Sequence, residues 1–400
     1  MIDGWEKSTL GHHIDLLTGY PFKSSEYSEE EGTIRLLRGD NIIQGIIRWE
    51  GVKRWKKTTD SKLQKYFLAP GDFVIAMDRT WVKAGLKASL ITEKDTPSLL
   101  VQRVARLRAK NGLHGKLLPI LIRSHRFEQY VKGVQTESAV PHISPSQIKE
   151  FSVLLPPLRE QKAIADLLTT WDEAIEDTER LIRAKQKNLK GQVQKLISQR
   201  CDSWTHIKPR EIFDTITEKN FPDEELLSVT QDRGVLPRSM SEGRVMSPDG
   251  TTANYKLIKR GDFAISLRSF QGGIEYSHYR GIISPAYTVL RAKVELDSDF
   301  YRLFFKSYIF IEKYLSLAVI GIRDGKQISV PDFLSIKIPV PPLKEQQKIA
   351  EVLTSSQQEL GLLKQLAIKY KKQKRGLMQK LLTGEWRVKP EIVNQYRGAS

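Results

Sequence analysis

The sequence predicts an α+β fold in which two mixed α/β modules are separated by two long helices that pair as an antiparallel coiled coil. The main observation is a repeated stretch: PPLREQKAIADLLT begins at Pro156, and PPLKEQQKIAEVLT begins at Pro341, 185 residues later. A block of short strand-like runs, separated by Gly, Asp and Asn turns, precedes each copy. The repeat therefore indicates an internal duplication with a pseudo-two-fold arrangement.

Each copy of the repeated stretch predicts one long helix with an apolar seam. The Pro-Pro pair at the start of each copy suits a first helical turn, and no proline follows until Pro209 and Pro390. The 4-3 spacing of a and d positions in a coiled coil runs through both copies. Polar residues such as Thr178 and Lys185 interrupt the seam, so we expect each helix to need the other as its partner. The apolar seam comprises Ile164, Leu168, Trp171, Ile175, Ile182, Leu189, Leu196, Ile349, Leu353, Leu360, Leu363, Tyr370, Leu377 and Leu381.

The repeat predicts five segments: a first module (1–155), a first helix (156–200), a second module (201–340), a second helix (341–388) and a tail (389–400). Landmarks keep their order: GDFVI at Gly71 is answered by GDFAI at Gly261, and HISPSQIKEFSVLLPP at His142 by QISVPDFLSIKIPVPP at Gln327. In the first module, residues 34–37, 73–76 and 99–107 predict strands, and residues 117–131 predict a helix. The sequence between the landmarks differs between the two modules, as expected of loops that bind different targets. Loops whose sequence is not under selection would diverge as well.

Two smaller features repeat as well. Gly191 and Gly376 occupy the same place in the two helices, where glycine costs about 1 kcal/mol relative to alanine. We expect either an exposed helix face or the close approach of another helix there. The sequence GEWR at Gly384 resembles the region around Trp204, which begins the second module, so we expect the tail to pack beside the first module.

The composition favours a polyanionic partner such as double-stranded DNA. The 400 residues include 64 Lys and Arg against 47 Asp and Glu, which gives a net charge of +17 and a pI near 9.6. No apolar run approaches the roughly 18 residues that span a membrane, and the N-terminus lacks the layout of a signal peptide. A single cysteine, Cys201, excludes an internal disulfide and a CxxC metal site. We therefore expect a cytoplasmic protein.

Patterns typical of catalysis are absent. The sequence has neither GxGxxG nor GxxxxGK[ST], the common phosphate-binding motifs. The tandem pair His12-His13 points its side chains apart and lacks further ligands at usable spacing, which favours a packed or solvated pair over a metal site. The acids of residues 222–225 are better read as turn residues than as a nuclease carboxylate pair. We expect no catalytic residue, no metal site and no cofactor on this chain.

The loops between the landmarks mix cations with aromatic and amide side chains. Arg and Lys neutralise phosphates, and Arg, Gln and Asn make bidentate contacts to base edges. Any basic protein has such loops, so the alternative for each residue is a solvated or packing role. The predicted DNA-binding residues are Arg48, Lys53, Arg54, Trp55, Lys56, Lys57, Arg79, Trp81, Lys83, Lys87, Arg233, Arg238, Arg268, Phe270, Gln271, Tyr276 and His278.

The duplicated PPLxEQ stretch, the paired GDF strands and the QKLLTGEWR ending at residues 379–387 resemble the specificity (S) subunits of type I restriction-modification systems. The resemblance covers the whole chain. It implies two target-recognition domains that each read one half of a bipartite DNA site, and helices that set the spacer and dock two methyltransferase (M) subunits. It also implies restriction (R) subunits, a non-catalytic role for this chain, and S-adenosylmethionine, ATP and Mg2+ on the partner subunits.

Two alternatives stay open. A stand-alone DNA-binding protein built from the same modules would act without enzyme partners, and no methyltransferase would purify with it. A nuclease with an unrecognised site would form product from duplex DNA by itself.

Overall fold

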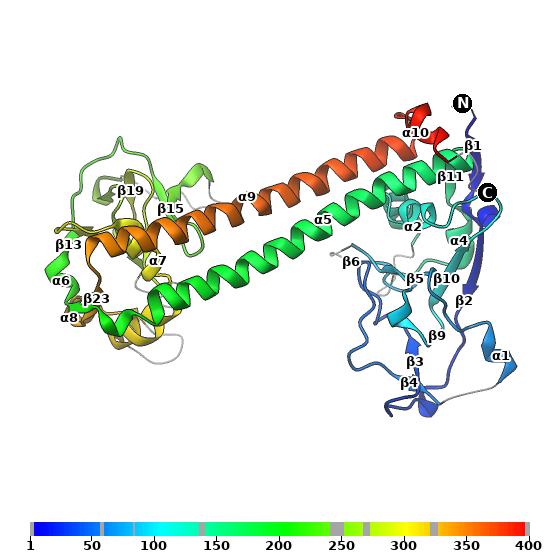
Figure 1. Cartoon of the computed structure of the whole chain (residues 1–400), viewed down its shortest axis with the longest axis horizontal. Coiled ribbons are helices and arrows are strands. Elements are labelled where there is room, and N and C mark those ends of the chain that lie inside the picture. The colour runs from blue at the N-terminus through cyan, green and yellow to red at the C-terminus, as the bar shows by residue number, and fades with distance from the viewer. Residues whose placement is uncertain are drawn as a thin grey trace. The chain divides into compact units, whose positions relative to one another are not determined.

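The computed structural model describes residues 4–56, 60–82, 85–135, 141–240, 252–266, 273–320 and 327–396. The chain divides into two compact units, Met1–Asp177 with Ala367–Ser400 (unit 1) and Thr178–Leu366 (unit 2). Each unit holds one module and part of each long helix (Figure 1). This division differs from the predicted segments because the helices are antiparallel, so each module packs with the start of one helix and the end of the other.

Unit 1 is organised around a four-stranded antiparallel sheet. Its strand order is β2 (Ile14–Thr18), β10 (Val104–Ala109), β5 (Phe73–Ala76) and β8 (Ala88–Leu90). All of β5 is buried, because its alternate side chains enter two different apolar clusters. The other elements of the module are β1 (Glu6–Thr9), β3 (Ile34–Leu37), β4 (Arg54–Trp55), β6 (Trp81–Val82), β7 (Gly85–Leu86), β9 (Ser98–Leu100), β11 (Ser152–Leu155), α1 (Ser61–Gln64), α2 (Leu117–Ile122), α3 (His125–Val134) and α4 (Pro145–Glu150).

Two predicted elements of the first module are each split in two. The expected helix 117–131 breaks at Ser124, whose hydroxyl donates to the carbonyl oxygen of Leu121 (2.6 Å) and accepts from the backbone N–H of Phe127 (3.3 Å). Serine is favoured at such an N-cap, so α2 ends and α3 begins there. The expected strand 99–107 breaks between β9 and β10, where Arg103 has a φ of 65°, which extended backbone does not allow.

Unit 2 repeats the sheet strand for strand. Its order is β13 (Phe213–Ile216), β20 (Tyr287–Ala292), β17 (Phe263–Ser266) and β18 (Glu275–Tyr276), again antiparallel. The internal repeat of the sequence is therefore a repeat of topology. The other elements of the module are β12 (Thr205–Ile207), β14 (Leu227–Thr230), β15 (Gly234–Pro237), β16 (Lys256–Ile258), β19 (Gly281–Ile283), β21 (Val319–Ile320), β22 (Gln327–Ile328), β23 (Ile338–Val340), α6 (Pro209–Ile212), α7 (Ser298–Phe304) and α8 (Val330–Ser335).

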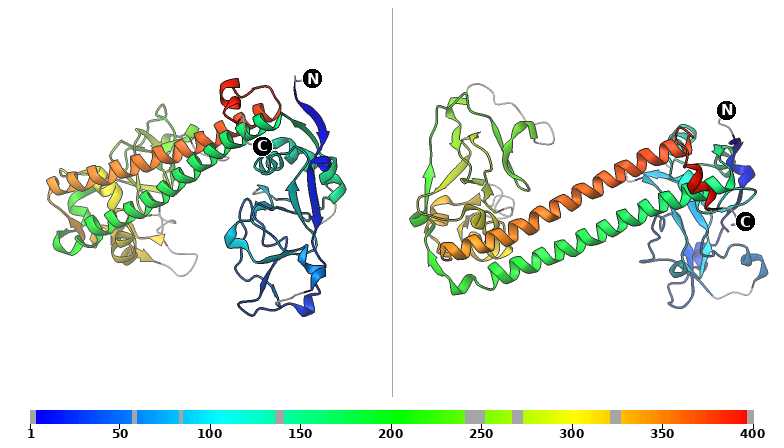
Figure 2. Two further views of the ribbon diagram at one scale, coloured as in Figure 1. Left: turned by 45° about the vertical axis from the view of Figure 1, so that its right-hand side comes forward. Right: turned by 45° about the horizontal axis from the view of Figure 1, so that its top comes forward.

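The long helices are α5 (Leu158–Val193) and α9 (Leu343–Leu382), and in each unit they lie side by side in opposite directions (Figure 2). Every residue of the predicted apolar seam is buried or partly buried. In unit 1, the rings of Trp171 and Tyr370 meet edge to face with centroids 5.6 Å apart. In unit 2, Lys185 is tolerated in the seam because its Nζ lies 2.7 Å from Oε1 of Glu359. Among the described residues, no helix combines the length and the apolar character that crossing a bilayer requires.

The two helix glycines face open space. A Cβ built on Gly191 or Gly376 would meet no atom of the described chain within 4 Å. Of the two expectations for these positions, the exposed face is therefore the one that the described residues match.

The tail packs against the first module, as predicted. α10 (Pro390–Asn394) follows a turn after α9, and Val388 is part of the main apolar core of unit 1. The hydroxyl of Tyr396 donates to Asp166 on α5 at 2.9 Å. The end of the chain and α5 therefore belong to one packed unit.

Candidate nucleic-acid interface

The glutamine of each PPLxEQ stretch connects a module to its long helix through side-chain hydrogen bonds. In unit 1, the side-chain oxygen of Gln161 accepts from the backbone N–H of His114 (2.8 Å), and its nitrogen donates to the carbonyl of Pro156 (2.9 Å). In unit 2, Gln346 repeats both contacts, with the loop before α7 (2.9 Å) and with the carbonyl of Pro341 (2.8 Å). Both glutamines are almost fully buried, so the motif is a structural joint.

The glutamate of the same stretch pairs with an arginine beyond the end of the other helix. Glu160 accepts from Arg387 (2.6 Å) and from the indole N–H of Trp5 (3.2 Å) in unit 1. Glu345 pairs with Arg200 (2.6 Å) in unit 2. These contacts tie the antiparallel helix ends together and leave neither carboxylate available for chemistry.

The GDF landmarks are structural as well. Gly71 and Gly261 have φ values of 90° and 94°, a conformation that glycine adopts without strain. The following Asp72 is buried and accepts two hydrogen bonds from Arg108 on β10, one of them at 2.9 Å. The landmark therefore shapes the turn before β5 and locks it to the neighbouring strand.

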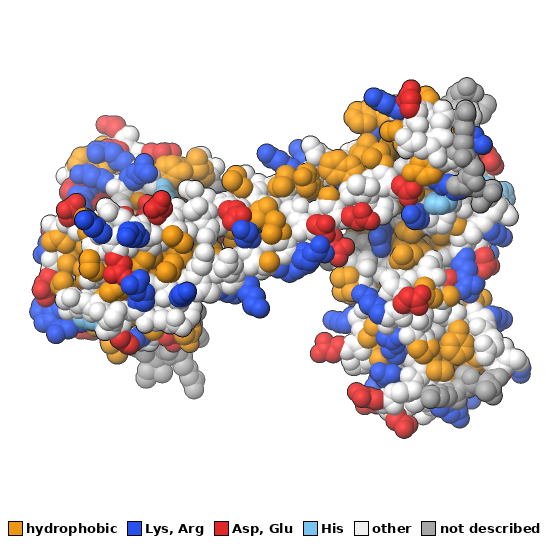
Figure 3. Space-filling view, viewed as in Figure 1, with side chains coloured by type: hydrophobic (Ala, Val, Ile, Leu, Met, Phe, Trp, Pro, Cys, Tyr) orange, Lys and Arg blue, Asp and Glu red, His pale blue; other side chains and the backbone are white. Residues whose placement is uncertain are grey.

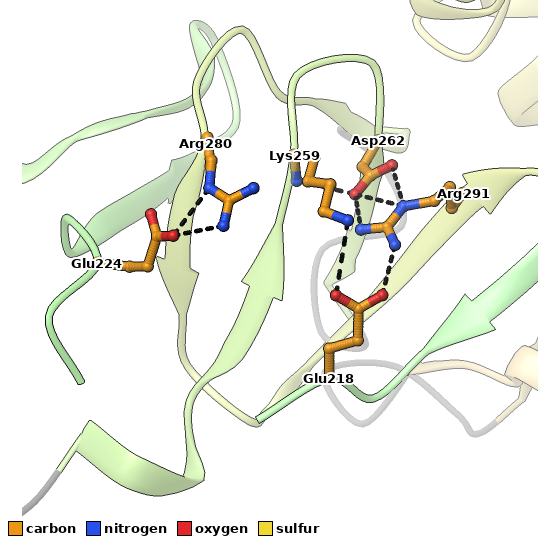
Figure 4. Close-up of polar contacts among 6 residues, drawn as sticks. All are labelled: Glu218, Glu224, Lys259, Asp262, Arg280 and Arg291. Atoms are coloured by element: carbon orange, nitrogen blue, oxygen red, sulfur yellow. Dashed lines mark hydrogen bonds and ion pairs between the residues drawn. The ribbon is translucent and has the colours of Figure 1, made fainter. Parts of the chain in front are cut away.

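Unit 2 extends this lock into a network of four charges (Figure 4). Arg291 on β20 lies 2.7 Å from Asp262 and 2.6 Å from Glu218, and Lys259 lies 3.8 Å from the other oxygen of Glu218. The hydrogen bond from Arg291 holds the pKa of Glu218 below its ordinary value, and the hydrogen bond to Asp262 raises the pKa of Arg291. Because Arg291 and Lys259 already pair with carboxylates inside unit 2, they are poor candidates for DNA contacts.

Several predicted DNA contacts in the first module already have partners inside unit 1. Lys53 forms an ion pair with Glu29, and Nη1 of Arg54 donates to a backbone carbonyl at 3.0 Å. Trp55 is only 8% exposed, and its ring centroid lies 4.8 Å from that of Phe22. Trp55 is therefore a core residue and not an exposed DNA contact.

The turn after β5 gathers cations around one carboxylate. Asp78 accepts from Arg103 (2.8 Å) and is hydrogen-bonded to Nδ1 of His142 (2.6 Å). Although burial acts to raise it, the hydrogen bonds from these two residues hold the pKa of Asp78 below its ordinary value. Arg79 and Arg103 both have positive φ values, 47° and 65°, which are uncommon outside glycine. The sequence prediction included Arg79 and missed Arg103 and His142; the polar Gln102-Arg103 step inside an apolar run was the available signal.

Two more predicted residues of the first module lie near this turn. Lys87 is partly buried, and burial lowers its pKa despite the nearby carboxylates of Asp40 and Asp78. Trp81 is partly buried, with Nζ of Lys132 lying 4.9 Å from its ring centroid. The aromatic–cation pattern of the sequence is thus partly an internal cation–π contact.

The second module also places its predicted residues unequally. Tyr276 is 5% exposed and packs against Phe263, so it is a core residue and not an exposed DNA contact. His278 is exposed, and its ring lies edge-to-face on that of Tyr276, with centroids 4.6 Å apart. Partial desolvation of the ring, together with the charge of Arg302, lowers the pKa of His278. Arg238 is partly buried.

The predicted cations that stand on the surface are few. Arg48, Lys56, Arg79 and Arg233 are exposed. On the face seen in Figure 3, Lys and Arg side chains are spread over both modules and mixed with Asp and Glu. The predicted residues that lie outside the described part of the chain are Lys57, Lys83, Arg268, Phe270 and Gln271.

The groups considered as catalytic candidates from the sequence have other roles in the described part of the chain. The described residues hold no group of three or more His, Cys, Asp or Glu side chains that could bind a metal ion. Burial raises the pKa of Cys201 to about 11, so its thiol is protonated at neutral pH. Nδ1 of His13 lies 2.8 Å from the carbonyl oxygen of Asn111, and Glu224 pairs with Arg280 at 2.6 Å (Figure 4). None of these groups is an activated nucleophile.

Comparison with known sequences gives relatives for both modules. The family model of the type I restriction modification DNA specificity domain matches residues 2–186 and 205–369. The specificity subunit of the type I restriction enzyme EcoAI of Escherichia coli is 34% identical over 180 residues, which are 45% of this chain and 30% of that protein. The MjaVIII specificity subunit of Methanocaldococcus jannaschii is 30% identical over 190 residues, 46% and 44% of the two chains. The match thus spans less than half of each relative.

Solved structures resemble the fold. The S subunit of the type I restriction-modification system from M. genitalium has a TM-score of 0.56 at 18% identity, covering 94% of this chain and 96% of its own. The HsdS subunit from Thermoanaerobacter tengcongensis has a TM-score of 0.50 at 18% identity, covering 96% and 98%. These likenesses confirm the predicted fold class. Because the family model covers both modules and most of both helices, the chain belongs to the type I restriction-modification DNA specificity family.

Proposed function

We propose that this chain is the DNA-specificity subunit of a type I restriction-modification complex. One observation carries the proposal: two modules share a sheet, a GD turn and a glutamine joint to a common helix pair, while the loops between these landmarks differ. One frame with two sets of loops suits a protein that reads two different DNA half-sites. The antiparallel helices then set the spacing between half-sites, as dimer geometry does in other DNA-binding proteins.

The DNA-reading surface is proposed to lie on the loops of each module. In unit 1 it includes Arg48, Lys56, Arg79 and Lys87, joined by Arg103, whose side chain is 71% exposed. In unit 2 it includes Arg233, Arg238 and His278. Lys57, Lys83, Arg268, Phe270 and Gln271 stay predictions from sequence. Lys53 and Arg54 are weaker candidates, because both are partly buried and each, like Arg103, would have to exchange an internal partner for DNA.

Two grooves on the helix pair support a second part of the proposal, the docking of two methyltransferase subunits. The unit 1 groove has a volume of about 430 Å³ and is lined by Leu167 and Leu381, among others. The unit 2 groove, of about 490 Å³, is lined by their sequence counterparts Val352 and Leu196. Two equivalent apolar grooves suit two copies of one partner.

The chemistry is assigned to partner subunits. The methyltransferase subunits would bind S-adenosylmethionine, and restriction subunits would use ATP and Mg2+. This chain would be non-catalytic and would act in the cytoplasm. The support is the match of the DNA specificity domain model to both modules.

Co-purification with the methyltransferase subunits of the same system tests the proposal. The complex should methylate duplex DNA at one bipartite site when S-adenosylmethionine is present, and the purified chain alone should neither methylate nor cleave DNA with Mg2+ added. Product from the chain alone would refute the non-catalytic role. Sequence-specific binding by a chain that retains no methyltransferase would favour the stand-alone DNA-binding protein.

A further inference from the structure

Each unit has a cleft between its module and a long helix, and the two clefts correspond. The unit 1 cleft, of about 510 Å³, contains Arg123, and the unit 2 cleft, of about 520 Å³, contains Lys306. Arg123 directly precedes Ser124, and Lys306 directly precedes Ser307. Both serines donate to a carbonyl three residues back at 2.6 Å and accept from an N–H three residues ahead at 3.3 Å. The two cations therefore occupy the same place in the repeated frame.

In unit 2, the ammonium group of Lys306 has partners within the protein. Nζ of Lys306 forms an ion pair with the buried carboxylate of Glu275 and donates to the carbonyl oxygen of Gln231 at 3.0 Å. Glu275 is on β18, where it pairs with Ala264, the second residue of β17.

In unit 1 the corresponding carboxylate is missing. Ser89 on β8 pairs with Val74, the second residue of β5, and so takes the place of Glu275. The Ser89 hydroxyl donates to the neighbouring carbonyl of Leu90 at 3.3 Å. The guanidinium of Arg123 lies 5.6 Å from the ring centroid of Phe73 and forms no hydrogen bond or ion pair with the described residues. Asp172 also lines the cleft and its charge acts on Arg123, but its carboxylate is paired with Lys374.

An arginine without a hydrogen bond or ion pair inside the protein is suited to bind an anion from outside. Arg123 is exposed, as expected of a group that lines an open cleft, although partial desolvation lowers its pKa and the carboxylate of Asp172 acts to raise it. Arginine stays charged in proteins, and its five N–H donors are costly to leave without acceptors once water is partly displaced. Phosphate oxygens match the guanidinium fork and can accept two parallel hydrogen bonds.

We propose that the Arg123 cleft is an anion site that takes one phosphate of the DNA backbone at the half-site read by unit 1. The inference rests on the proposed DNA-reading function and adds a residue that the sequence prediction did not contain. The position supports DNA as the source of the phosphate. A Cβ built on Gly45 would lie 3.5 Å from Nη2 of Arg123. The backbone N–H of Gly45 donates to the carbonyl oxygen of Ala88, which follows Lys87 in the sequence. Arg123 thus borders the loops that carry the predicted DNA-binding cations.

Arg123→Gln tests the site in the complex with methyltransferase subunits. Losing one charged, partly desolvated contact should weaken DNA binding about tenfold to a hundredfold. The slope of log K against log salt should fall by about 0.9, the contribution of one phosphate. The preferred bases should not change, because phosphate contacts position the protein and carry no sequence information. The melting temperature should change little, because in the free chain the Arg123 guanidinium has only its contact with the Phe73 ring and the nearby charge of Asp172 to lose, and no hydrogen bond or ion pair with the described residues.

Two further variants make the result specific. Ser89→Glu supplies the carboxylate that unit 2 has, so it should neutralise Arg123 internally and weaken DNA binding in the same way. Arg126→Gln removes an exposed cation nearby on α3 and should have little effect. If the wild-type complex shows no specific binding, the proposed function fails. If it binds and Arg123→Gln binds equally well, or loses methyltransferase affinity instead, only the phosphate site is refuted.

Chemical footprinting gives a measurement that does not depend on a variant's folding. Phenylglyoxal should modify Arg123 in the wild-type complex, and duplex DNA containing the site should protect it. Inorganic phosphate at matched ionic strength should protect it much less, because a free phosphate lacks the other contacts of the DNA. Equal protection by inorganic phosphate, or no protection by DNA, would overturn the proposal.

Discussion

The interiors of the two modules differ more than their frames do. α2 contributes leucine and isoleucine side chains to the core of unit 1, whereas α7 contributes Phe300, Tyr301 and Phe304 to the core of unit 2. The rings of Phe300 and Phe304 are parallel, 6.1 Å apart. The polar joints, in contrast, are the same: a glutamine at the helix start, a serine N-cap and a buried Asp–Arg lock.

The comparison shows which contacts define the frame. A hydrogen-bonded joint works only within a narrow range of distance and angle, so its residues have few substitutes. An apolar core accepts different side chains if their total volume and pattern are kept. Two copies of one fold can therefore differ widely in core and loops while the joints keep the strand order and the helix attachment.

The largest effect should come from the Asp–Arg lock, and it should be unequal in the two modules. Asp262→Ala removes the buried partner of Arg291, which is 24% exposed, and leaves it only the more exposed carboxylate of Glu218, which should cost about 3–5 kcal/mol. Asp72→Ala should cost less, about 1–3 kcal/mol, because Arg108 is 43% exposed and can be hydrated. Hydrogen exchange of the β20 and β10 amides in the full chain measures each loss.

The exposed pair of Asp214 and Lys293 provides a control for this experiment. Asp214→Asn should change the stability of unit 2 by no more than about 0.5 kcal/mol, because surface ion pairs contribute little. Equal losses for Asp262→Ala and Asp72→Ala would show that the network around Arg291 adds nothing to the simpler lock of unit 1.

A smaller effect should come from Glu275, which has no acidic counterpart in unit 1. Burial raises its pKa to about 7, although the hydrogen bond from Lys306 acts to lower it. An unfolded glutamate titrates near pH 4.3, so between that pH and about 7 the folded module holds the proton more tightly. The free energy of unfolding should therefore fall as pH rises through this window, by on the order of 2 kcal/mol.

Glu275→Gln cannot ionise and should remove that part of the pH dependence. Urea unfolding of the full chain between pH 4 and about 7.5 measures it, followed by hydrogen exchange of β18 to assign the change to unit 2. Glu211→Gln, at an exposed glutamate, should leave the slope as in the wild type. An unchanged slope in Glu275→Gln would contradict the assignment.

The fold was predictable where the sequence repeats itself. The seam follows from a 4-3 spacing present in both copies, and the tail follows from the likeness of its GEWR sequence to the region around Trp204. The break at Arg103 was not predictable, because its positive φ occurs where its backbone carbonyl accepts from Met77 and its side chain pairs with Asp78, 25 residues away in sequence. Local patterns do not contain such tertiary constraints.

The site was less predictable than the fold. Alternation of Arg, Trp and Lys looks the same whether an aromatic ring faces solvent or the core, and only packing places Trp55 and Tyr276 inside. Arg123 is conspicuous only once the strand register aligns Ser89 with Glu275 and shows that one cation lacks its carboxylate. That alignment needs the structure of both modules.

A module exchange tests most directly whether each module reads its own half-site. Residues 1–155 would be replaced by the corresponding module of another family member, and adenine methylation would be mapped genome-wide in cells that express the complex. The account predicts that one half of the bipartite site changes while the other half and the spacer stay the same. A change in both halves, or no change in an active complex, would contradict it.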